Sequence, residues 1–230
     1  MKKILVTGGT TFVSKYVAQY FVNQKYDVYV LNRNTKSQIS GVKLIEGDRH
    51  NLGSKLKDIH FDVVMDITAY DAMDIIDLCD SLGGFEQYIM ISSSAVYLPK
   101  DGDMKMQFFH VRDLCKFMEK IIEENPVEHI YNVGNKEAIS IKDWVTKCYA
   151  CLDKKPVFVN VYEDIEQRNY FSFYNYEYYL DVKRQSEIYP ETISLDEGLW
   201  EAAEWYLENE NEVNRKPLFE FIDENLQILE

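Results

Sequence analysis

Short apolar runs alternate with longer amphipathic stretches from Lys3 to Ser92. The runs are rich in β-branched and aromatic residues, which is typical of buried strands. They lie at residues 4–6, 28–31, 42–45, 63–65 and 88–91. Between the first two runs, apolar side chains recur at steps of three and four from Val13 to Phe21, as on a helix that packs against a sheet. The alternation predicts repeated βα units around a parallel sheet.

The later sequence predicts mainly helices. A helical pattern over residues 111–124 ends before Pro126, and residues 130–133 predict one more strand. Ser140 is expected to cap a following helix, because its hydroxyl can accept a hydrogen bond from an unpaired amide. Two further helices are expected around residues 200–206 and 219–226.

These elements predict an α/β fold, a Rossmann-type doubly wound parallel sheet with a small C-terminal α-rich lobe. We expect the sheet domain to span residues 1–156 and the lobe, on the substrate side, to span residues 157–230. The lobe begins with a segment dense in tyrosine. Core packing is the expected use of most of these rings, and stacking against a sugar or a base is the alternative.

The composition indicates in which cellular compartment the protein is expected. No run approaches the ~20 apolar residues of a membrane-spanning helix, and the start at Met1 leads directly into a strand rather than a signal peptide. We therefore expect a cytoplasmic protein with no membrane partner. The four cysteines lack the spacing of a disulfide framework, and Cys148-x-x-Cys151 lacks a second ligand pair. Two helical thiols are expected there, and no metal site.

The chain is acidic. It has 25 lysines and arginines against 39 aspartates and glutamates, a net charge of −14. Such a chain repels a phosphate backbone on average, so we expect no nucleic-acid partner.

The turn after the first strand, Thr7 to Ser14, opens the first helix. Backbone amides and the helix dipole at such a turn can bind a pyrophosphate. Gly8 permits the tight turn, whereas Thr11 and Ser14 occupy places where glycines are usual in this motif. The residues expected to contact the cofactor here are Gly8, Thr10, Thr11, Phe12 and Val13.

Asn32, Arg33 and Asn34 end the second strand, where NAD-binding proteins commonly place an acid for the ribose hydroxyls. An arginine there can instead pair with a 2′-phosphate. This favours NADP as the cofactor, with NAD possible; a solvent-exposed arginine at the entry of a helix is the alternative.

Two later strand ends complete a resemblance to the NAD-dependent epimerase/dehydratase family of extended short-chain dehydrogenases and reductases. Gly47-Asp48-Arg49 resembles the family's G-D motif, whose Asp contacts adenine. Ile67, Thr68 and Ala69 loosely resemble its small-residue segment beside the adenosine ribose. The resemblance implies that Asp48, Arg49 and residues 67–69 line the cofactor; a loop carboxylate with a local partner is the alternative for Asp48.

Further motifs extend the resemblance along the chain. Ser92-Ser93-Ser94-Ala95-Val96-Tyr97 is similar to the family's S-S-x-x-V-Y strand end, which implies that Ser93 hydrogen-bonds the substrate oxygen; a serine-rich loop entrance is the alternative. Shorter matches are the V-x-D segment at 111–113, the N-V-G segment at 132–134 and the L-x-E-G-L segment at 195–199.

One family feature does not follow Tyr97. The family's next helix carries Y-x-x-x-K, whose tyrosine shuttles a proton, but here Tyr97 and Lys100 are three apart with Pro99 between them. Either the chain has an internal deletion near residues 97–98, or the sequence omits residues at that point.

The sequence thus predicts an NAD(P)-dependent epimerase or reductase that acts on a nucleotide sugar or a related hydroxyl or carbonyl compound. The alternative is a catalytically inactive NADP-binding sensor or interaction module. The oligomeric state stays open.

Overall fold

A computed structural model covers the chain and describes residues 1–93, 100–101, 104–158, 166, 169–171, 176–177, 179–213 and 218–225. The chain forms two compact units. Unit 1 contains Met1–Val96 and Val111–His129, and unit 2 contains Tyr97–His110 and Ile130–Glu230. The expected division at 156/157 falls inside unit 2, because the chain leaves unit 1, returns to it for one helix, and leaves it again.

The core of unit 1 is a parallel sheet with the strand order β3-β2-β1-β4-β5. Its strands are β1 (Lys3–Thr7), β2 (Asp27–Asn32), β3 (Lys43–Glu46), β4 (His60–Asp66) and β5 (Gly84–Met90). Each expected apolar run overlaps one of these strands, although residue 42 precedes β3, residue 91 follows β5, and β5 begins earlier than expected. The order reverses at β1, so the carboxyl ends of β1 and β4 flank a topological switch point.

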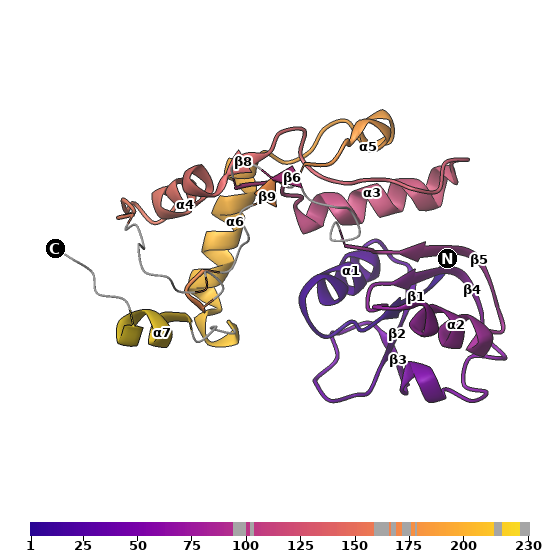
Figure 1. Cartoon of the computed structure of the whole chain (residues 1–230). Coiled ribbons are helices and arrows are strands. Elements are labelled where there is room, and N and C mark those ends of the chain that lie inside the picture. The colour runs from indigo at the N-terminus through magenta and orange to yellow at the C-terminus, as the bar shows by residue number, and fades with distance from the viewer. Residues whose placement is uncertain are drawn as a thin grey trace. The chain divides into compact units, whose positions relative to one another are not determined.

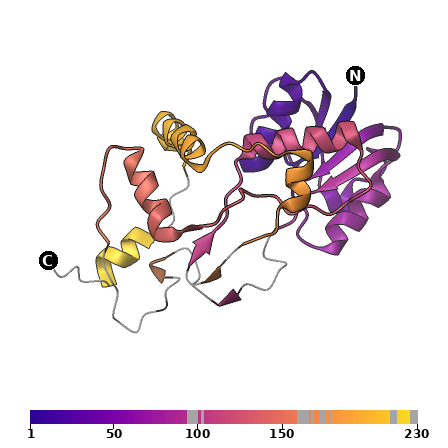
Figure 2. The ribbon, with the colours of Figure 1, turned by 90° about the horizontal axis from the view of Figure 1, so that it is seen from above.

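Helices cover both faces of this sheet (Figures 1 and 2). α1 (Phe12–Asn23) and α3 (Val111–Glu124) pack on one face, and α2 (Ala72–Ser81) lies on the other beside the short 3₁₀ helix η1 (Arg49–Asn51). This arrangement confirms the predicted Rossmann-type α/β fold.

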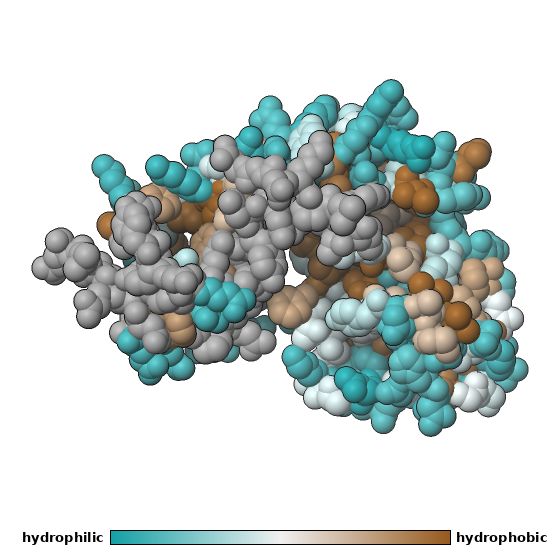
Figure 3. Space-filling view, in the orientation of Figure 1, coloured by the Kyte–Doolittle hydropathy of each residue, from teal (hydrophilic) through white to brown (hydrophobic). Residues whose placement is uncertain are grey.

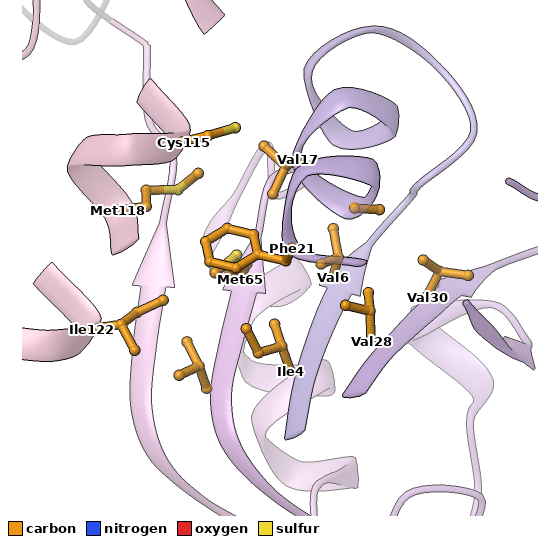
Figure 4. Close-up of a cluster of buried hydrophobic side chains, with 12 residues drawn as sticks. Ile4, Val6, Val17, Phe21, Val28, Val30, Met65, Cys115, Met118 and Ile122 are labelled. Atoms are coloured by element: carbon orange, nitrogen blue, oxygen red, sulfur yellow. The ribbon is translucent and has the colours of Figure 1, made fainter. Parts of the chain in front are cut away.

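The sheet and its helices enclose two apolar clusters. In one of them Phe21 of α1 packs with strand residues such as Ile4 and Met65 and with Met118 and Ile122 of α3 (Figure 4). The second cluster, around Leu5 and Phe61, lies against α2. These clusters fix the sheet, and with it the loops at the carboxyl ends of its strands.

Unit 2 combines helices with a small sheet that was not expected. The helices are α4 (Ile141–Ala150), α5 (Lys183–Ile188), α6 (Leu195–Glu208) and α7 (Leu218–Asn225), with the 3₁₀ helix η4 (Glu210–Glu212). Two-residue strands β6 (Lys100–Asp101), β7 (Lys105–Met106), β8 (Ile139–Ser140) and β9 (Tyr176–Glu177) pair in the order β6-β9-β7-β8.

Ser140 caps α4 as expected, since its hydroxyl accepts a hydrogen bond from the Asp143 amide at 3.1 Å. The prediction of a strand at 130–133 is wrong. These residues have the apolar, β-branched composition of a strand, but they belong to unit 2, and no described strand pairs with them. Composition alone does not make a strand where no partner is available.

Outside the grey atoms, the face shown in Figure 3 has hydrophilic residues interspersed with apolar ones. Within the described part of the chain, no helix is both long and apolar enough to cross a membrane. The four cysteines are free thiols, as expected, and burial raises the pKa of Cys115 to about 12.

Candidate functional site

The first turn of unit 1 depends on two glycines. Gly8 and Gly9 both have φ of +89°, a conformation that L side chains rarely adopt. A Cβ on Gly8 would lie 2.8 Å from Ser14 Oγ, and a Cβ on Gly9 would lie 2.6 Å from a Val30 methyl. The turn therefore accepts Ser14 in place of a glycine because Gly8 leaves room for it.

The start of α1 carries several backbone amides without a hydrogen-bond partner in the described part of the chain. Thr11 is the N-cap residue in an extended conformation, with no side-chain capping bond, whereas Asp71, Ser140 and Ser194 cap α2, α4 and α6. The Gly8 amide donates to the Leu31 carbonyl at 2.9 Å. Among the described residues, no partner is found for the amides from Gly9 to Ser14. Unpaired amides at the N-terminus of a helix can bind an anion.

Phe12 follows this cap with an unusual backbone. Its φ is +45°, and its side chain is 84% exposed. Thr10 and Thr11 are half-buried, and Val13 packs against the first apolar cluster. Phe12 is thus open to solvent within unit 1, whereas Gly9 and Ser14 on either side of it are buried. The positive φ of Phe12 is local backbone strain of the kind found at binding sites.

The end of β2 is an ordered polar loop. The side-chain amide of Asn32 donates to the Gly8 carbonyl at 2.7 Å and to the side chain of Gln38 at 3.0 Å. Asn34, with φ of +54°, donates its backbone amide to Asn32 and its side-chain amide to Glu46. Arg33 is exposed and makes no hydrogen bond or ion pair with the described residues. The loop therefore carries an exposed arginine next to Asn32, the residue that bonds the glycine turn.

The end of β3 carries Asp48, which caps η1 by accepting a hydrogen bond from the His50 amide at 3.0 Å. Its side chain is exposed. Arg49 points the other way. Its guanidinium is 11% exposed and bonds Asp66 at 2.8 Å and the Thr68 hydroxyl at 2.8 Å. Asp48 is therefore available to a ligand, whereas Arg49 is engaged within the protein.

Asp66, at the end of β4, is the centre of a buried polar network that the sequence did not indicate. It is fully buried and accepts hydrogen bonds from Arg49, from Thr7 Oγ1 at 2.8 Å and from the Tyr88 hydroxyl at 2.6 Å. Burial alone would raise the pKa of Asp66, but the hydrogen bonds from Arg49, Tyr88 and Thr7 outweigh it, and the pKa is lowered. Burial and the bond to Asp66 raise the pKa of Tyr88.

The segment after β4 is fixed by the same network. The Ile67 and Thr68 amides both donate to Thr7 Oγ1, at 2.9 and 3.2 Å. Ala69 is half-buried, and the Tyr70 amide donates to Asp74 Oδ2 at 2.7 Å. Residues 67–69 therefore lie beside the end of β1, as expected for a ligand-facing edge.

Ser93 follows the end of β5 and is exposed. The segment where we expected a deletion or an omission, Val96 to Pro99, lies outside the described residues, as does the rest of the S-S-x-x-V-Y match. The Y-x-x-x-K spacing does occur later, at Tyr179 and Lys183. Lys183 is the first residue of α5 and Tyr179 precedes that helix, so the two do not share a helical face.

The two C-terminal motif matches have packing roles within unit 2. In the N-V-G segment, the Gly134 amide donates to the buried Gln185 side chain at 2.8 Å. In the L-x-E-G-L segment, a Cβ on Gly198 would lie 3.0 Å from the His110 ring, so this glycine lets α6 approach the residues before α3.

Residues 4–76 match the family model described as "NAD dependent epimerase/dehydratase family". This range holds β1 to β4 and the start of α2, together with the glycine turn and the Asp48 loop. This part of the chain resembles that family. The resemblance expected from the motifs is therefore confirmed over residues 4–76.

The chain is also similar to a curated protein and to a solved structure. The chain is 32% identical over 119 residues to the chloroplast stem-loop binding protein of 41 kDa b of Arabidopsis thaliana, a match that covers 44% of this chain and 31% of that protein. A dTDP-glucose 4,6-dehydratase from Bacillus anthracis, solved with NAD, has the same fold, with a TM-score of 0.67 and 15% identity over 92% of this chain and 98% of that chain.

A third comparison agrees on the fold. The structure entitled MoeE5 in complex with UDP-glucose and NAD has a TM-score of 0.72 and 15% identity, over 90% of this chain and 99% of that chain. Identities this low establish the architecture alone. The match to the stem-loop binding protein spans about a third of that protein's length.

Proposed function

We propose that this protein binds NADP, or NAD, at the carboxyl edge of the unit 1 sheet and is an NAD(P)-dependent epimerase or reductase acting on a nucleotide sugar or a related hydroxyl or carbonyl compound. The observation that carries the proposal is the start of α1. Its amides from Gly9 to Ser14 have no described partner, and Gly8 keeps the approach to them open. A diphosphate can accept hydrogen bonds from these amides, and its negative charge interacts favourably with the helix dipole.

The remaining cofactor contacts follow from the order of the strand ends. Thr10, Thr11, Phe12 and Val13 would contact the diphosphate, Asn32 and Asn34 would frame the adenosine ribose, and Asp48 would accept a hydrogen bond from adenine. Ile67, Thr68 and Ala69 would line the opposite side. The two solved structures of the same fold support this reading, because both contain NAD.

Arg33 is the basis for preferring NADP. We expect Arg33→Gln to lower the NADP-to-NAD affinity ratio about tenfold, because one charge-assisted hydrogen bond contributes about 1.5–3 kcal/mol. Titration calorimetry with both cofactors measures the ratio. Lys36→Gln removes the same charge from the same exposed loop and should leave the ratio unchanged. An equal loss in both variants, or no loss in Arg33→Gln, would contradict the assignment.

The chemistry would take place beyond the end of β5. When bound, the nicotinamide supplies a hydride acceptor or donor for a substrate carbon. The Ser93 hydroxyl would orient the substrate oxygen by a hydrogen bond, and the groups of residues 67–69 would exclude water from the ribose side. We expect Ser93→Ala to reduce turnover of a nucleotide-sugar substrate at least about tenfold at unchanged cofactor affinity, measured by cofactor absorbance. Unchanged turnover would remove Ser93 from the reaction.

The second candidate is a cofactor-binding module without turnover, a sensor or an interaction module. It is favoured by the absence of a Y-x-x-x-K pair directly after Tyr97. The two candidates share the binding site and differ in one readout. Cofactor binding without conversion of UDP-glucose, UDP-galactose or dTDP-glucose favours the module, and any conversion excludes it.

Nucleic acid does not fit the proposal, although one relative is named for stem-loop binding. Unit 1 has 13 basic and 16 acidic residues, and unit 2 has 12 basic and 23 acidic residues. Neither unit has the basic excess that a phosphate backbone requires. We propose a small-molecule partner, a cytoplasmic location and no membrane partner.

A further inference from the structure

Asp74, on α2, links the two loops that the proposed function places beside adenosine. Its Oδ2 accepts hydrogen bonds from the Tyr70 amide at 2.7 Å and the Asp71 amide at 3.3 Å. Its Oδ1 lies 3.3 Å from His50 Nε2 and 3.7 Å from Arg49 Nε. One carboxylate therefore contacts both the loop after β4 and the η1 loop that follows Asp48.

His50 is the residue of this contact network whose charge changes near neutral pH. Its Nδ1 lies 2.7 Å from Asp77 Oδ2, and its Nε2 faces Asp74, so the ring spans two carboxylates one helical turn apart on α2. The other charged groups around it are Asp48 and Arg49 of its own loop. Only the protonated ring can donate from both nitrogens, so the full set of contacts requires the imidazolium.

Asp48 is held in place through His50. The His50 backbone amide donates to the Asp48 carboxylate, so the placement of His50 sets the direction of the Asp48 side chain. The ring is 53% exposed and exchanges protons freely with solvent. Loss of its charge leaves the ring with one N–H donor for two carboxylates, so one of its two contacts with α2 is lost, whereas the Arg49 contacts with Asp66 and Asp74 remain.

We propose that Asp74 and His50 are positioning residues for the nucleotide site: together they hold the Asp48 loop against the segment 67–70, so that nucleotide affinity follows the protonation of His50. The proposal rests on the proposed function, since it concerns the adenosine side of that site. Neither residue was among those expected from the motifs.

The direction of the pH effect follows from the neighbours. The hydrogen bond to Asp77, with the charges of Asp74, Asp77 and Asp48, raises the pKa of His50. A raised pKa in the folded state means that the contact is complete below the ordinary value of about 6.5 and is lost as the pH rises through the folded-state pKa. Affinity for the nucleotide should therefore decline on the alkaline side of about pH 6.5.

The test measures the affinity of 5′-AMP, ADP-ribose and NADP between about pH 5.5 and 8.5. We expect wild-type affinity to fall about three- to tenfold across this range, the effect of a half to one pKa unit of coupling. His50→Gln should bind at the weak, high-pH level throughout. Asp74→Asn should weaken all three ligands at every pH, because the amide keeps the Tyr70 contact and loses the charge.

His60→Gln is the matched control. His60 lies in unit 1 at the opposite end of β4, 62% exposed and 3.9 Å from Glu86, so the same substitution removes a similar ion pair away from the carboxyl edge. Its pH profile should match wild type. A profile that persists in His50→Gln, or is lost equally in His60→Gln, overturns the proposal.

A ligand-free readout separates this proposal from the proposed function. Amide hydrogen exchange at His50 and Tyr70 should quicken as the pH rises beyond the intrinsic increase, and the excess should vanish in His50→Gln. If no nucleotide binds at any pH, the proposed function fails, and the exchange data still decide whether the link exists. Absence of the excess rejects the link.

Discussion

Asp66→Ala is expected to lower the free energy of unfolding of unit 1 by about 3–5 kcal/mol, because it leaves the Arg49 guanidinium buried without its main partner. The Tyr88 hydroxyl and Thr7 Oγ1 lose an acceptor at the same time. Chemical denaturation monitored by circular dichroism measures the effect. Asp66→Asn keeps the volume and should cost less, which keeps the prediction testable if the alanine variant fails to fold.

Asp58→Asn provides the comparison for Asp66. Asp58 is exposed and has no described partner, so its loss should change stability by less than about 0.5 kcal/mol. The pH dependence has a defined sign. The lowered pKa of Asp66 means that its contribution is present above the unfolded value of about 3.9 and is lost as the pH falls further. A neutral-pH cost below about 1 kcal/mol would contradict a central role for this carboxylate.

Gly8→Val is expected to weaken NADP binding at least about tenfold. Its Cβ would lie 2.8 Å from Ser14 Oγ and 3.2 Å from a Thr68 methyl, and φ of +89° is strained for a branched residue. The turn must shift, and the amides that follow it shift with it. Fluorescence titration measures the affinity, and thermal unfolding in the same samples shows whether the variant is folded; Gly8→Ala is the milder second variant.

Gly53→Ala controls for the general cost of a side chain at positive φ. Gly53 has φ of +58°, and no atom lies within 4 Å of its Cβ position, so the variant should lose only about 1 kcal/mol of stability and keep wild-type affinity. If Gly8→Val folds and binds NADP as tightly as Gly53→Ala does, the glycine turn is not the diphosphate site.

The periodicity of apolar residues predicted the sheet of unit 1 well, because its strands and helices pack against one another through their apolar side chains. The runs at 28–31 and 63–65 lie on β2 and β4, and α3 spans the expected 111–124. The strand expected at 130–133 was wrong because strand formation depends on a partner distant in sequence. The two-residue strands of unit 2 are too short to leave a periodic pattern.

The candidate site also has residues that the sequence predicted and residues that it did not. Gly8, Asn32 and Asp48 were recognisable because each follows a strand directly, and parallel strands bring their carboxyl ends to one edge. The network of Asp66, Arg49 and Asp74 could not be predicted from spacing, since it joins residues of β4, η1 and α2 through side-chain geometry. The signal that was available is the Asp71-x-x-Asp74 spacing of a capping box at the start of α2.

The most direct test of the account follows amide hydrogen exchange from Gly9 to Ser14 with and without saturating NADP. These amides have no described partner in the free protein, so they should exchange rapidly alone and at least about tenfold more slowly when a diphosphate accepts their hydrogen bonds. Protection is expected to be centred on this segment. Unchanged exchange there at a saturating NADP concentration would contradict it.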